Sequence, residues 1–482
     1  MTRQHSFFAG LRRRFSGQHE NVRPAPAERL RLSGKGLRVP FEGAPFLVEM
    51  GKQTLHICPD LPVDNRLRKS VQDFIVFDPA LYYSGIAQSL RLAPGKKLAI
   101  DYREESQKFV FSHARDAFRR HLQITHEGDS LVFRDPISEL GTYVSVLTEE
   151  KDTKRLETHR QKNLEKIIEI FGGPIERLSP DSALDSLRKV NRLLKDDPHR
   201  RKDSFGNAGA LVELPTRLTP IVVGDLHAQL DNLLKILSEN AYLDCMEQGK
   251  AALILLGDAV HPEADGELEY MDSSVLIMDL IFKLKLRFPE QVFFIVGNHD
   301  SFSPDVMKAG VPQSLLWDKK IKEWRGEEYR EELALFYRQS PLVVLSKDFV
   351  ACHAGPPRSK VNLDKLVEAR QFPNLVHELT WNRVKTRGFP LGYTRKDVNR
   401  FRKSLKLEDT KPFIVAHYPQ SKDGTIWQNV EHIPQHHVLY SARPNQLAVF
   451  TRVMGEMVPQ IYPAEALLEP INRMAETHGS AM

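Results

Sequence analysis

Cysteine is scarce in this chain. Its three cysteines, Cys58, Cys245 and Cys352, are far apart and lie in unrelated sequence contexts, which excludes a disulfide framework and a zinc site made of thiolates. Long apolar runs are missing as well, since none approaches the ~20 residues that cross a bilayer. The basic N-terminal stretch also lacks the apolar core and the cleavage site of a secretory signal. We therefore expect a cytoplasmic protein without a membrane span.

A strong excess of either charge is also absent. Lys and Arg total 68 against 63 Asp and Glu, so the net charge of +5 does not by itself argue for a nucleic-acid partner. Hydrophobic residues make up 41% and charged residues 27% of the chain, which excludes a wholly disordered or fibrous protein. The length of 482 residues predicts two or three globular domains.

The sequence pattern changes several times along the chain. Residues 1–37 carry many arginines among Pro, Ser and Gly, which predicts a flexible basic arm. Short alternating apolar stretches from 38 to 147 predict a small all-β domain. Residues 148–209 contain two apolar patterns at helical spacing, which predict a helical linker and lead-in. A catalytic domain is assigned to residues 210–465, and a tail to residues 466–482.

In the second half, five apolar stretches each run into a side chain that can bind a metal ion. These side chains are Asp225, His227, Asp258, Asn298, His353 and His417. In layered α/β folds the carboxyl ends of the strands line the functional crevice, so we expect these residues to converge although they are distant in sequence. Each element alone has an ordinary structural explanation, such as a turn or a helix cap, but the ordered set favours a metal site.

The chemistry of this set suits two divalent ions. Carboxylate, imidazole and amide ligands without thiolate favour metals such as Mn, Fe or Zn. Asp258 can share its carboxylate oxygens between both ions. The two ions would then deprotonate a bridging water and hold the oxygens of a phosphoryl group. His299, next to Asn298, is placed to protonate the leaving oxygen. The sequence therefore predicts a dinuclear phosphoesterase centre.

The blocks GDLHAQ, GDAVH, GNHD, CHAG and AHYP, between residues 219 and 453, resemble those of the metallophosphoesterases. They are most similar to the phosphoprotein phosphatase family, which includes the calcineurin-like serine/threonine phosphatases. The resemblance implies an α/β fold, a β-sandwich flanked by helices, and metal-dependent hydrolysis of phosphomonoesters with His299 as the general acid. Arg387 resembles the family's second phosphate-binding arginine, and Arg383 and Arg358 are other candidates for that role.

Three positions depart from the family pattern. Gly-Asp-x-Val-Asp-Arg-Gly normally supplies an aspartate that orients the general acid and an arginine that grips phosphate, whereas this chain has His261 and Pro262 there. Loss of a bidentate guanidinium should lower the rate or redirect specificity. Asp300 stands where a glutamate is commoner, and in this respect the chain resembles the family's dinucleoside tetraphosphate hydrolases.

Three functions stay open. They are a phosphoprotein phosphatase, a hydrolase of nucleotides, dinucleoside polyphosphates or another phosphorylated small molecule, and a catalytically weak pseudo-phosphatase that acts as a phosphoprotein-binding scaffold.

The segments FRRHLQI and FRDPISELGTYV, within residues 89–147, resemble a forkhead-associated domain. The resemblance implies a β-sandwich whose loops bind phosphothreonine peptides. Family positions are echoed by Arg119, His121, Ser138, Gly141 and Thr142. Phe118 and Leu140, however, stand where a serine and an asparagine are usual. The sequence therefore favours a sandwich that docks a protein partner or packs on the catalytic domain over one that binds phosphopeptides.

Overall fold

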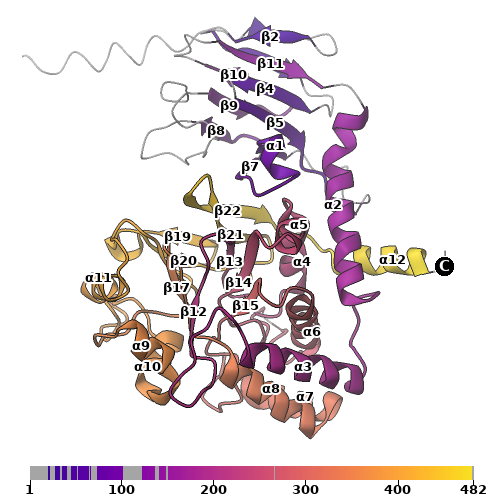
Figure 1. Ribbon diagram of the computed structural model, residues 1–482. Helices are drawn as coiled ribbons and strands as arrows, with labels where there is room; N and C mark the ends of the chain where they lie inside the picture. The colour runs from indigo at the N-terminus through magenta and orange to yellow at the C-terminus, as the bar shows by residue number, and fades with distance from the viewer. Residues whose placement is uncertain are drawn as a thin grey trace, which may run out of the picture. The chain divides into compact units, whose positions relative to one another are not determined.

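The computed structural model describes residues 20–21, 28–32, 35–40, 45–50, 53–64, 66, 73–100, 122–135, 141–147, 150–264 and 266–479. These residues divide into two compact units. Residues 84–86 and all described residues from Arg160 onward belong to the second unit, and the others belong to the first. Each unit contains its own pair of β-sheets (Figure 1).

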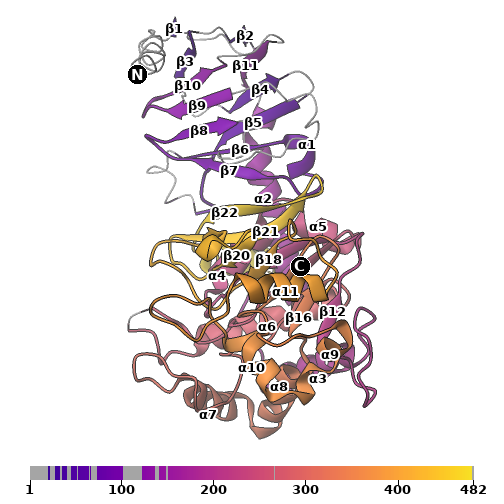
Figure 2. The same ribbon diagram turned by 90° about the vertical axis from the view of Figure 1, so that its left-hand side faces the viewer.

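The first unit is built from short strands and one short helix, α1 (Pro79–Tyr82). Its strands are β1 (Glu20–Asn21), β2 (Arg29–Arg31), β3 (Leu37–Pro40), β4 (Phe46–Met50), β5 (Gln53–Pro59), β6 (Phe74–Phe77), β7 (Ser89–Leu92), β8 (Lys97–Ile100), β9 (Leu122–His126), β10 (Ser130–Arg134) and β11 (Thr142–Val146). One sheet has the order β1-β3-β10-β9-β8, and the other has the order β2-β11-β4-β5-β6-β7 (Figure 2).

Alternating side chains explain why these strands form a sandwich. In β4, Phe46, Val48 and Met50 are buried while the residues between them are partly exposed, as expected for a strand with one apolar face. The apolar faces of both sheets meet in one core, where Phe133 of β10 packs with Phe46 of β4 at a ring separation of 5.7 Å. The prediction of an all-β domain ahead of the catalytic domain is therefore confirmed.

Part of the segment assigned to a flexible arm is instead held in this sandwich. Strand β2 pairs with β11, and the guanidinium of Arg29 lies 3.8 Å from the ring centroid of Tyr143. Arg29 Nε also donates to Glu49 Oε2 at 2.7 Å. These cross-strand contacts involve residues far along the chain, so the local composition gave no sign of them. Residues 1–19, 22–27 and 33–34 of the predicted arm lie outside the described part.

The second unit contains both mixed sheets and all the longer helices that follow α2 (Glu150–Phe171), which begins in the first unit and ends in the second. Its strands are β12 (Leu211–Glu213), β13 (Thr219–Val223), β14 (Ala251–Leu255), β15 (Val292–Phe294), β16 (Val343–Leu345), β17 (Val350–Cys352), β18 (Phe413–Val415), β19 (Ile426–Gln428), β20 (His436–Leu439), β21 (Gln446–Val453) and β22 (Glu456–Pro463). Its helices are α3 (Pro180–Lys195), α4 (Leu230–Ser238), α5 (Tyr242–Glu247), α6 (Asp272–Arg287), α7 (Gln313–Arg325), α8 (Glu327–Gln339), α9 (Leu363–Val367), η2 (Ala369–Gln371), α10 (Pro373–Trp381), α11 (Arg395–Ser404), η3 (Val430–His432) and α12 (Leu468–Gly479).

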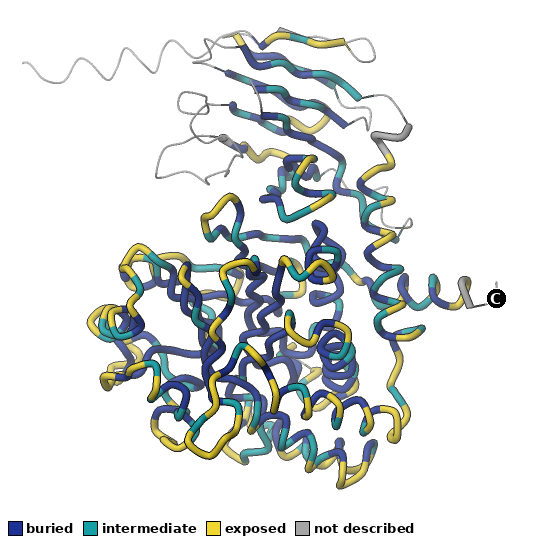
Figure 3. Tube along the Cα trace, in the orientation of Figure 1, coloured by how far each residue is buried: buried dark blue, intermediate teal, exposed yellow. Residues whose placement is uncertain are grey.

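The two sheets of this unit face each other between layers of helices. Their orders are β12-β16-β17-β18-β20-β19 and β15-β14-β13-β21-β22. Val222 and Ile254 of one sheet share a core cluster with Ala351 and Ile414 of the other. Helices α9, α10 and α11 lie on one side of the sheets, and α4, α5 and α6 on the other (Figure 1). The strands form the buried centre of the unit (Figure 3), and the predicted α/β sandwich flanked by helices is confirmed.

Parallel pairing positions the functional loops. Strands β13, β14 and β15 are parallel neighbours in one sheet, and β17, β18 and β20 are parallel neighbours in the other. Neighbouring parallel strands end at the same edge of a sheet, so the loops that follow them lie close together. The predicted metal-binding residues all lie in the loops after β13, β14, β15, β17 and β18.

The segment assigned to a tail, residues 466–482, contains helix α12. Asp231 Oδ1 in α4 accepts hydrogen bonds from Leu467 N at 2.9 Å and Leu468 N at 2.7 Å, and Ile471 is fully buried. This segment therefore packs on α4 as part of the second unit. None of the helices in the described residues is long and apolar enough to cross a membrane. The three cysteines are buried.

Candidate metal centre

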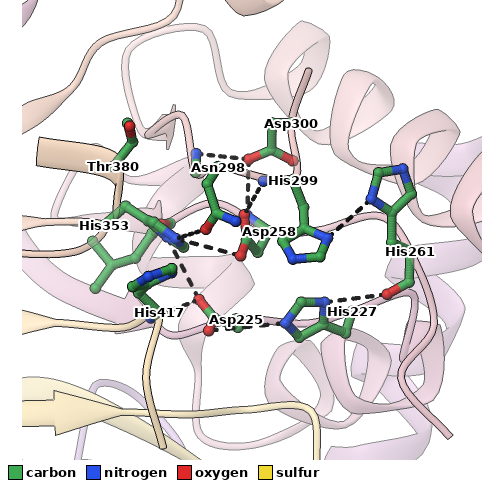
Figure 4. Close-up of polar contacts among 12 residues, drawn as sticks. Asp225, His227, Asp258, His261, Asn298, His299, Asp300, His353, Thr380 and His417 are labelled. Atoms are coloured by element: carbon green, nitrogen blue, oxygen red, sulfur yellow. Dashed lines mark hydrogen bonds and ion pairs between the residues drawn. The ribbon is translucent and has the colours of Figure 1, made fainter. Parts of the chain in front are cut away.

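The loops at this edge bring the predicted ligands together (Figure 4). Asp225, His227 and Asp258 offer ligand atoms that lie within 4.8 Å of one another, and Asp258, His353 and His417 form a second such group. Asp258 belongs to both groups, as expected for a carboxylate shared between two ions. Asn298 joins the second group because its Oδ1 lies 3.0 Å from His353 Nε2. All six predicted ligands therefore converge.

The backbone of this region has unusual conformations. Four residues have backbone φ angles in the left-handed region, which residues other than glycine rarely adopt. They are His227 (40°), Asp258 (48°), His261 (69°) and His417 (62°). Four such residues in one cluster are typical of a functional site, because the surrounding structure must hold each of them there. Gly257, with φ of 94°, approaches the neighbouring loop so closely that a Cβ atom would overlap its backbone.

Buried charge supports metal binding. Asp225 is fully buried, and its Oδ2 atom has no hydrogen-bond partner within the described residues. Burial raises the pKa of Asp225 to about 7, whereas His353 and His299 outweigh burial at Asp258 and hold the pKa of that carboxyl well below its usual range. A buried carboxylate oxygen without a hydrogen-bond partner is costly unless it coordinates a cation. The donor set therefore fits two divalent ions.

Carbonyl groups orient the histidine rings. His227 Nδ1 lies 3.1 Å from the carbonyl oxygen of His261, and His353 Nδ1 lies 2.7 Å from that of Leu256. Because a carbonyl oxygen only accepts, each Nδ1 carries a proton and each Nε2 faces the carboxylates. Burial lowers the pKa of His353, but Asp258 and Asp225 outweigh it and raise the pKa to about 9. Both rings would thus present Nε2 to any bound ions, as metal-binding histidines commonly do.

An arginine lies directly beside the second group of ligands. Arg383 Nε donates to His417 Nε2 at 3.4 Å. The Arg383 guanidinium also lies 4.5 Å from the ring centroid of Tyr418 and 5.7 Å from that of Phe389. Two aromatic rings therefore limit the movement of this cation at the edge of the site.

The other two candidate arginines have different surroundings. Arg387, the arginine expected from the sequence, is exposed in a turn closed by backbone hydrogen bonds between Thr386 and Phe389. Arg358 is exposed and pairs with Glu378, at 3.3 Å between Nε and Oε1. The structure therefore brings Arg383 to the metal ligands, while a catalytic role for Arg387 stays a prediction.

Comparison with known proteins agrees with this geometry. Residues 218–450 match the family described as calcineurin-like phosphoesterase. This part of the chain is therefore similar to the calcineurin-like phosphoesterases. Over 162 residues the chain is 26% identical to the serine/threonine-protein phosphatase PP2A-like PPG1 of Candida albicans, a match that covers 33% of this chain and only 34% of that protein.

Two solved structures are similar to the chain as well. A protein serine/threonine phosphatase from Saccharomyces cerevisiae, described as similar to human phosphatase PP5, has 16% identity and a TM-score of 0.43, and the match covers 60% of this chain and 90% of that one. A cold-active protein-tyrosine phosphatase from a Shewanella species has 12% identity and a TM-score of 0.37, covering 52% of this chain and 83% of that one.

His299, the candidate general acid, is hydrogen-bonded to Asp258, the carboxylate common to both groups of candidate ligands. His299 N donates to Asp258 Oδ1 at 2.8 Å, and His299 Nδ1 lies 3.1 Å from His261 Nδ1. Asp300 holds the same loops together, since its Oδ2 accepts from Asp258 N and Gly297 N, each at 2.8 Å. The sequence identified Asp300 only as a substitution, and its structural role comes from contacts between two loops.

The sequence analysis missed an acidic residue at this site. Glu263 Oε1 lies 3.4 Å from His227 Nε2, Tyr440 OH donates to Glu263 Oε2 at 2.6 Å, and Lys308 pairs with the same carboxylate. Burial raises the pKa of Glu263, but His227 and Lys308 outweigh it and lower the pKa to about 2. The available signal was that Glu263 replaces a glycine of the family motif directly after Pro262.

Proposed function

We propose that this protein is a metal-dependent phosphoester hydrolase, and specifically a phosphoprotein phosphatase. The observation that carries the proposal is Asp258, which is common to two groups of ligand atoms and also holds the backbone of His299. Two divalent ions bound there would activate a water for attack on phosphorus and offset charge on the phosphoryl oxygens. Asp225 and His227 would hold one ion.

The second ion would be held by Asn298, His353 and His417, with Asp258 shared. Oxygen and imidazole ligands without thiolate suit Mn, Fe or Zn. Chain contacts fix these ligands before any ion binds, because His353 Nδ1 donates to a backbone carbonyl and His417 N donates to Asp225 Oδ1 at 3.3 Å. Such preorganisation reduces the reorganisation required during the reaction.

His299 would donate the proton to the leaving oxygen. Burial lowers the pKa of His299 to about 4, so the resting ring is neutral at neutral pH and must take up a second proton before it can act as the acid. Nε2 of His261 is buried without a partner among the described residues. An unpaired N–H is rarer in proteins than an unpaired acceptor, so we assign the His261 proton to Nδ1, which then donates to His299 Nδ1. That arrangement leaves the His299 proton on Nε2, the nitrogen available to a substrate.

Arg383 is the side chain best suited to bind the phosphate. It lies beside His417, and the rings of Tyr418 and Phe389 restrict its guanidinium. A guanidinium held in this way loses little conformational freedom when it forms charge-assisted hydrogen bonds with phosphoryl oxygens. We propose that Arg383 binds the substrate phosphate in place of the family's arginine, whose position is occupied by Pro262 in this chain.

We infer that the substrate is a phosphoprotein. Leu391 is 75% exposed and Tyr418 is 43% exposed, and both belong to the part of the chain that surrounds Arg383. Exposed apolar side chains beside a phosphate-binding group suit the neighbouring side chains of a polypeptide. The Candida albicans relative is named as a serine/threonine-protein phosphatase, which supports the same substrate class.

The test is hydrolysis of p-nitrophenyl phosphate and of phosphoserine, phosphothreonine and phosphotyrosine peptides with added Mn. Wild type is compared with Asp258→Asn, His299→Ala and the exposed control Arg395→Gln. We expect turnover that requires metal, is retained by the control and is lost in the other two variants. Turnover of nucleotides or dinucleoside polyphosphates alone would select the nucleotide hydrolase. Two bound metals without any turnover would select the phosphoprotein-binding scaffold.

We further propose that the first unit supplies targeting or regulation in the cytoplasm by docking a protein partner. Thr142, one of the residues that resemble the forkhead-associated family, is fully buried, and its hydroxyl donates to Asp135. That contact leaves Thr142 poorly placed for a phosphothreonine ligand. Arg119, His121 and Ser138 lie outside the described residues. Binding of a phosphothreonine peptide library by the full chain, lost on phosphatase treatment of the peptides, would contradict simple docking.

A further inference from the structure

A second cluster of cations lines a pocket in the second unit. The pocket has a volume of about 350 Å³, and its wall includes Arg330, Arg338 and Arg370. We call it the arginine pocket. Asp300 and Ser301, which directly follow His299, form another part of its wall. The arginine pocket is therefore built on the same loop as the general-acid candidate, but it contains none of the six metal ligands.

Helix α8 creates the hollow by the spacing of its residues. Arg330, Ala334 and Arg338 recur every four residues, so they lie on one face of the helix. The small side chain of Ala334 leaves space between the two longer arginines. Arg330 is fixed from outside, because its Nε donates to Asp318 Oδ1 at 2.6 Å and its guanidinium lies 4.4 Å from the ring centroid of Phe302.

The third arginine has an unmet hydrogen-bonding group. Arg370 Nη2 donates to the carbonyl oxygens of Ser340 and Tyr337 at the end of α8, but its Nε atom is buried and has no partner in the described part of the chain. Burial and the nearby Arg200 and Arg338 lower the pKa of Arg370 to about 9. A largely buried cation such as Arg370, with other cations nearby, is costly unless an anion accompanies it.

Few anions of the chain itself can serve as that partner. Asp318 already pairs with Arg330, and Arg338 and Arg370 form no ion pair among the described residues. Asp300 lies in the pocket wall, but its carboxylate oxygens accept from the backbone amides of Asp258, Ala259 and Gly297. The arginine pocket thus combines space, excess positive charge and an unpaired N–H donor.

We infer that the arginine pocket binds a phosphate group at a site separate from the metal centre. Planar guanidinium groups match the oxygens of phosphate and form strong charge-assisted hydrogen bonds with them. The volume admits inorganic phosphate or the phosphate of a small phosphomonoester. Because Ser301 lies two residues after His299, an anion in the pocket would contact the loop that carries the general-acid candidate. The inference does not rest on turnover by the metal centre.

The test is calorimetric titration of the full-length, Mn-loaded protein with inorganic phosphate and, separately, with O-phosphoserine. Wild type is compared with Asp258→Asn, which disables the metal centre and prevents turnover of phosphoserine during the titration. We expect two phosphates per chain in wild type and one in Asp258→Asn. Binding of both ligands to that variant would assign the pocket to phosphate groups in general, and binding of phosphate alone would restrict it to the free ion.

Two changes then locate the remaining site. Ala334→Leu fills the hollow without changing charge and should remove the site that Asp258→Asn retains. Arg338→Gln removes an exposed cation that the fold does not need, and should raise the dissociation constant at least about tenfold. Arg395→Gln, an exposed arginine of α11, is the matched control and should have no effect. Circular dichroism verifies that each variant folds.

Phosphate binding to Asp258→Asn that neither pocket variant changes would overturn the inference, as would an Asp258→Asn protein that binds no phosphate. Absence of turnover in the wild type while two phosphates bind would instead contradict the proposed function, and the inference about the arginine pocket would still hold.

Discussion

The Nδ1 atoms of His261 and His299 lie 3.1 Å apart, so one hydrogen bond joins two imidazole rings at the site (Figure 4). The family that this chain resembles has an aspartate at the position of His261. An aspartate would both orient His299 and stabilise its protonated form, whereas a neutral imidazole can only orient it. The replacement therefore separates two effects that a carboxylate would combine.

His261→Asp should restore the second effect. A carboxylate beside His299 favours the imidazolium and should raise the pKa of the general acid by about one to three units. The general acid must be protonated to act, so kcat should persist to higher pH in this variant. The pH dependence of kcat for p-nitrophenyl phosphate measures the shift. His261→Asn, which is polar and uncharged, is the control, and equal profiles for both variants would contradict a role for charge at this position.

Glu263 places a negative charge 3.4 Å from His227 Nε2, where a phosphate dianion would approach the metal centre. Glu263→Gln keeps the shape of the side chain and frees Lys308 from its ion pair. We expect KM for p-nitrophenyl phosphate to fall by a factor of about five, which is the effect of ~1 kcal/mol for a partly exposed charge. Lys308→Met should raise KM instead. A KM that changes in the same direction in both variants would exclude this electrostatic explanation.

The sequence and the structure favour different arginines for the phosphate. Arg383 lies beside His417, whereas Arg387 is exposed in a turn. Arg383→Gln should lower kcat/KM for p-nitrophenyl phosphate by about tenfold to a hundredfold, the usual loss for a hydrogen bond to a charged group. Arg387→Gln should change it less than about twofold, as for most surface charges. A larger loss in Arg387→Gln would restore the assignment made from the family motif.

These arginines illustrate what the sequence could reveal. The convergence of the candidate ligands from Asp225 to His417 was predictable because each follows an apolar strand, and parallel strands end at one edge of a sheet. The positions of Arg383 and Lys308 depend on how irregular loops pack against each other, and no periodicity in the sequence indicates that packing. Strand β2 was missed for a related reason, since its partner β11 lies far along the chain. Local patterns thus predicted the centre of the site better than its edge.

Two buried histidines should make the second unit sensitive to acid. Burial lowers the pKa of His436 and of His437 to about 3. His436 Nε2 bonds Tyr393 OH at 2.9 Å, and the ring of His437 stacks on Phe450 with the centroids 5.0 Å apart. Both contacts are compatible with neutral rings that water cannot reach.

The sign of the pH effect follows from these pKa values. In the unfolded chain both rings take up a proton near pH 6.5, whereas in the folded chain they do so only near pH 3. Stability is therefore complete above about pH 6.5 and falls as the pH decreases towards 3, by about 1.4 kcal/mol per pH unit for each proton. Urea unfolding between pH 7 and 4.5 should show a slope smaller by about one proton in His437→Gln than in wild type. Equal slopes would mean that His437 does not gain its proton on unfolding.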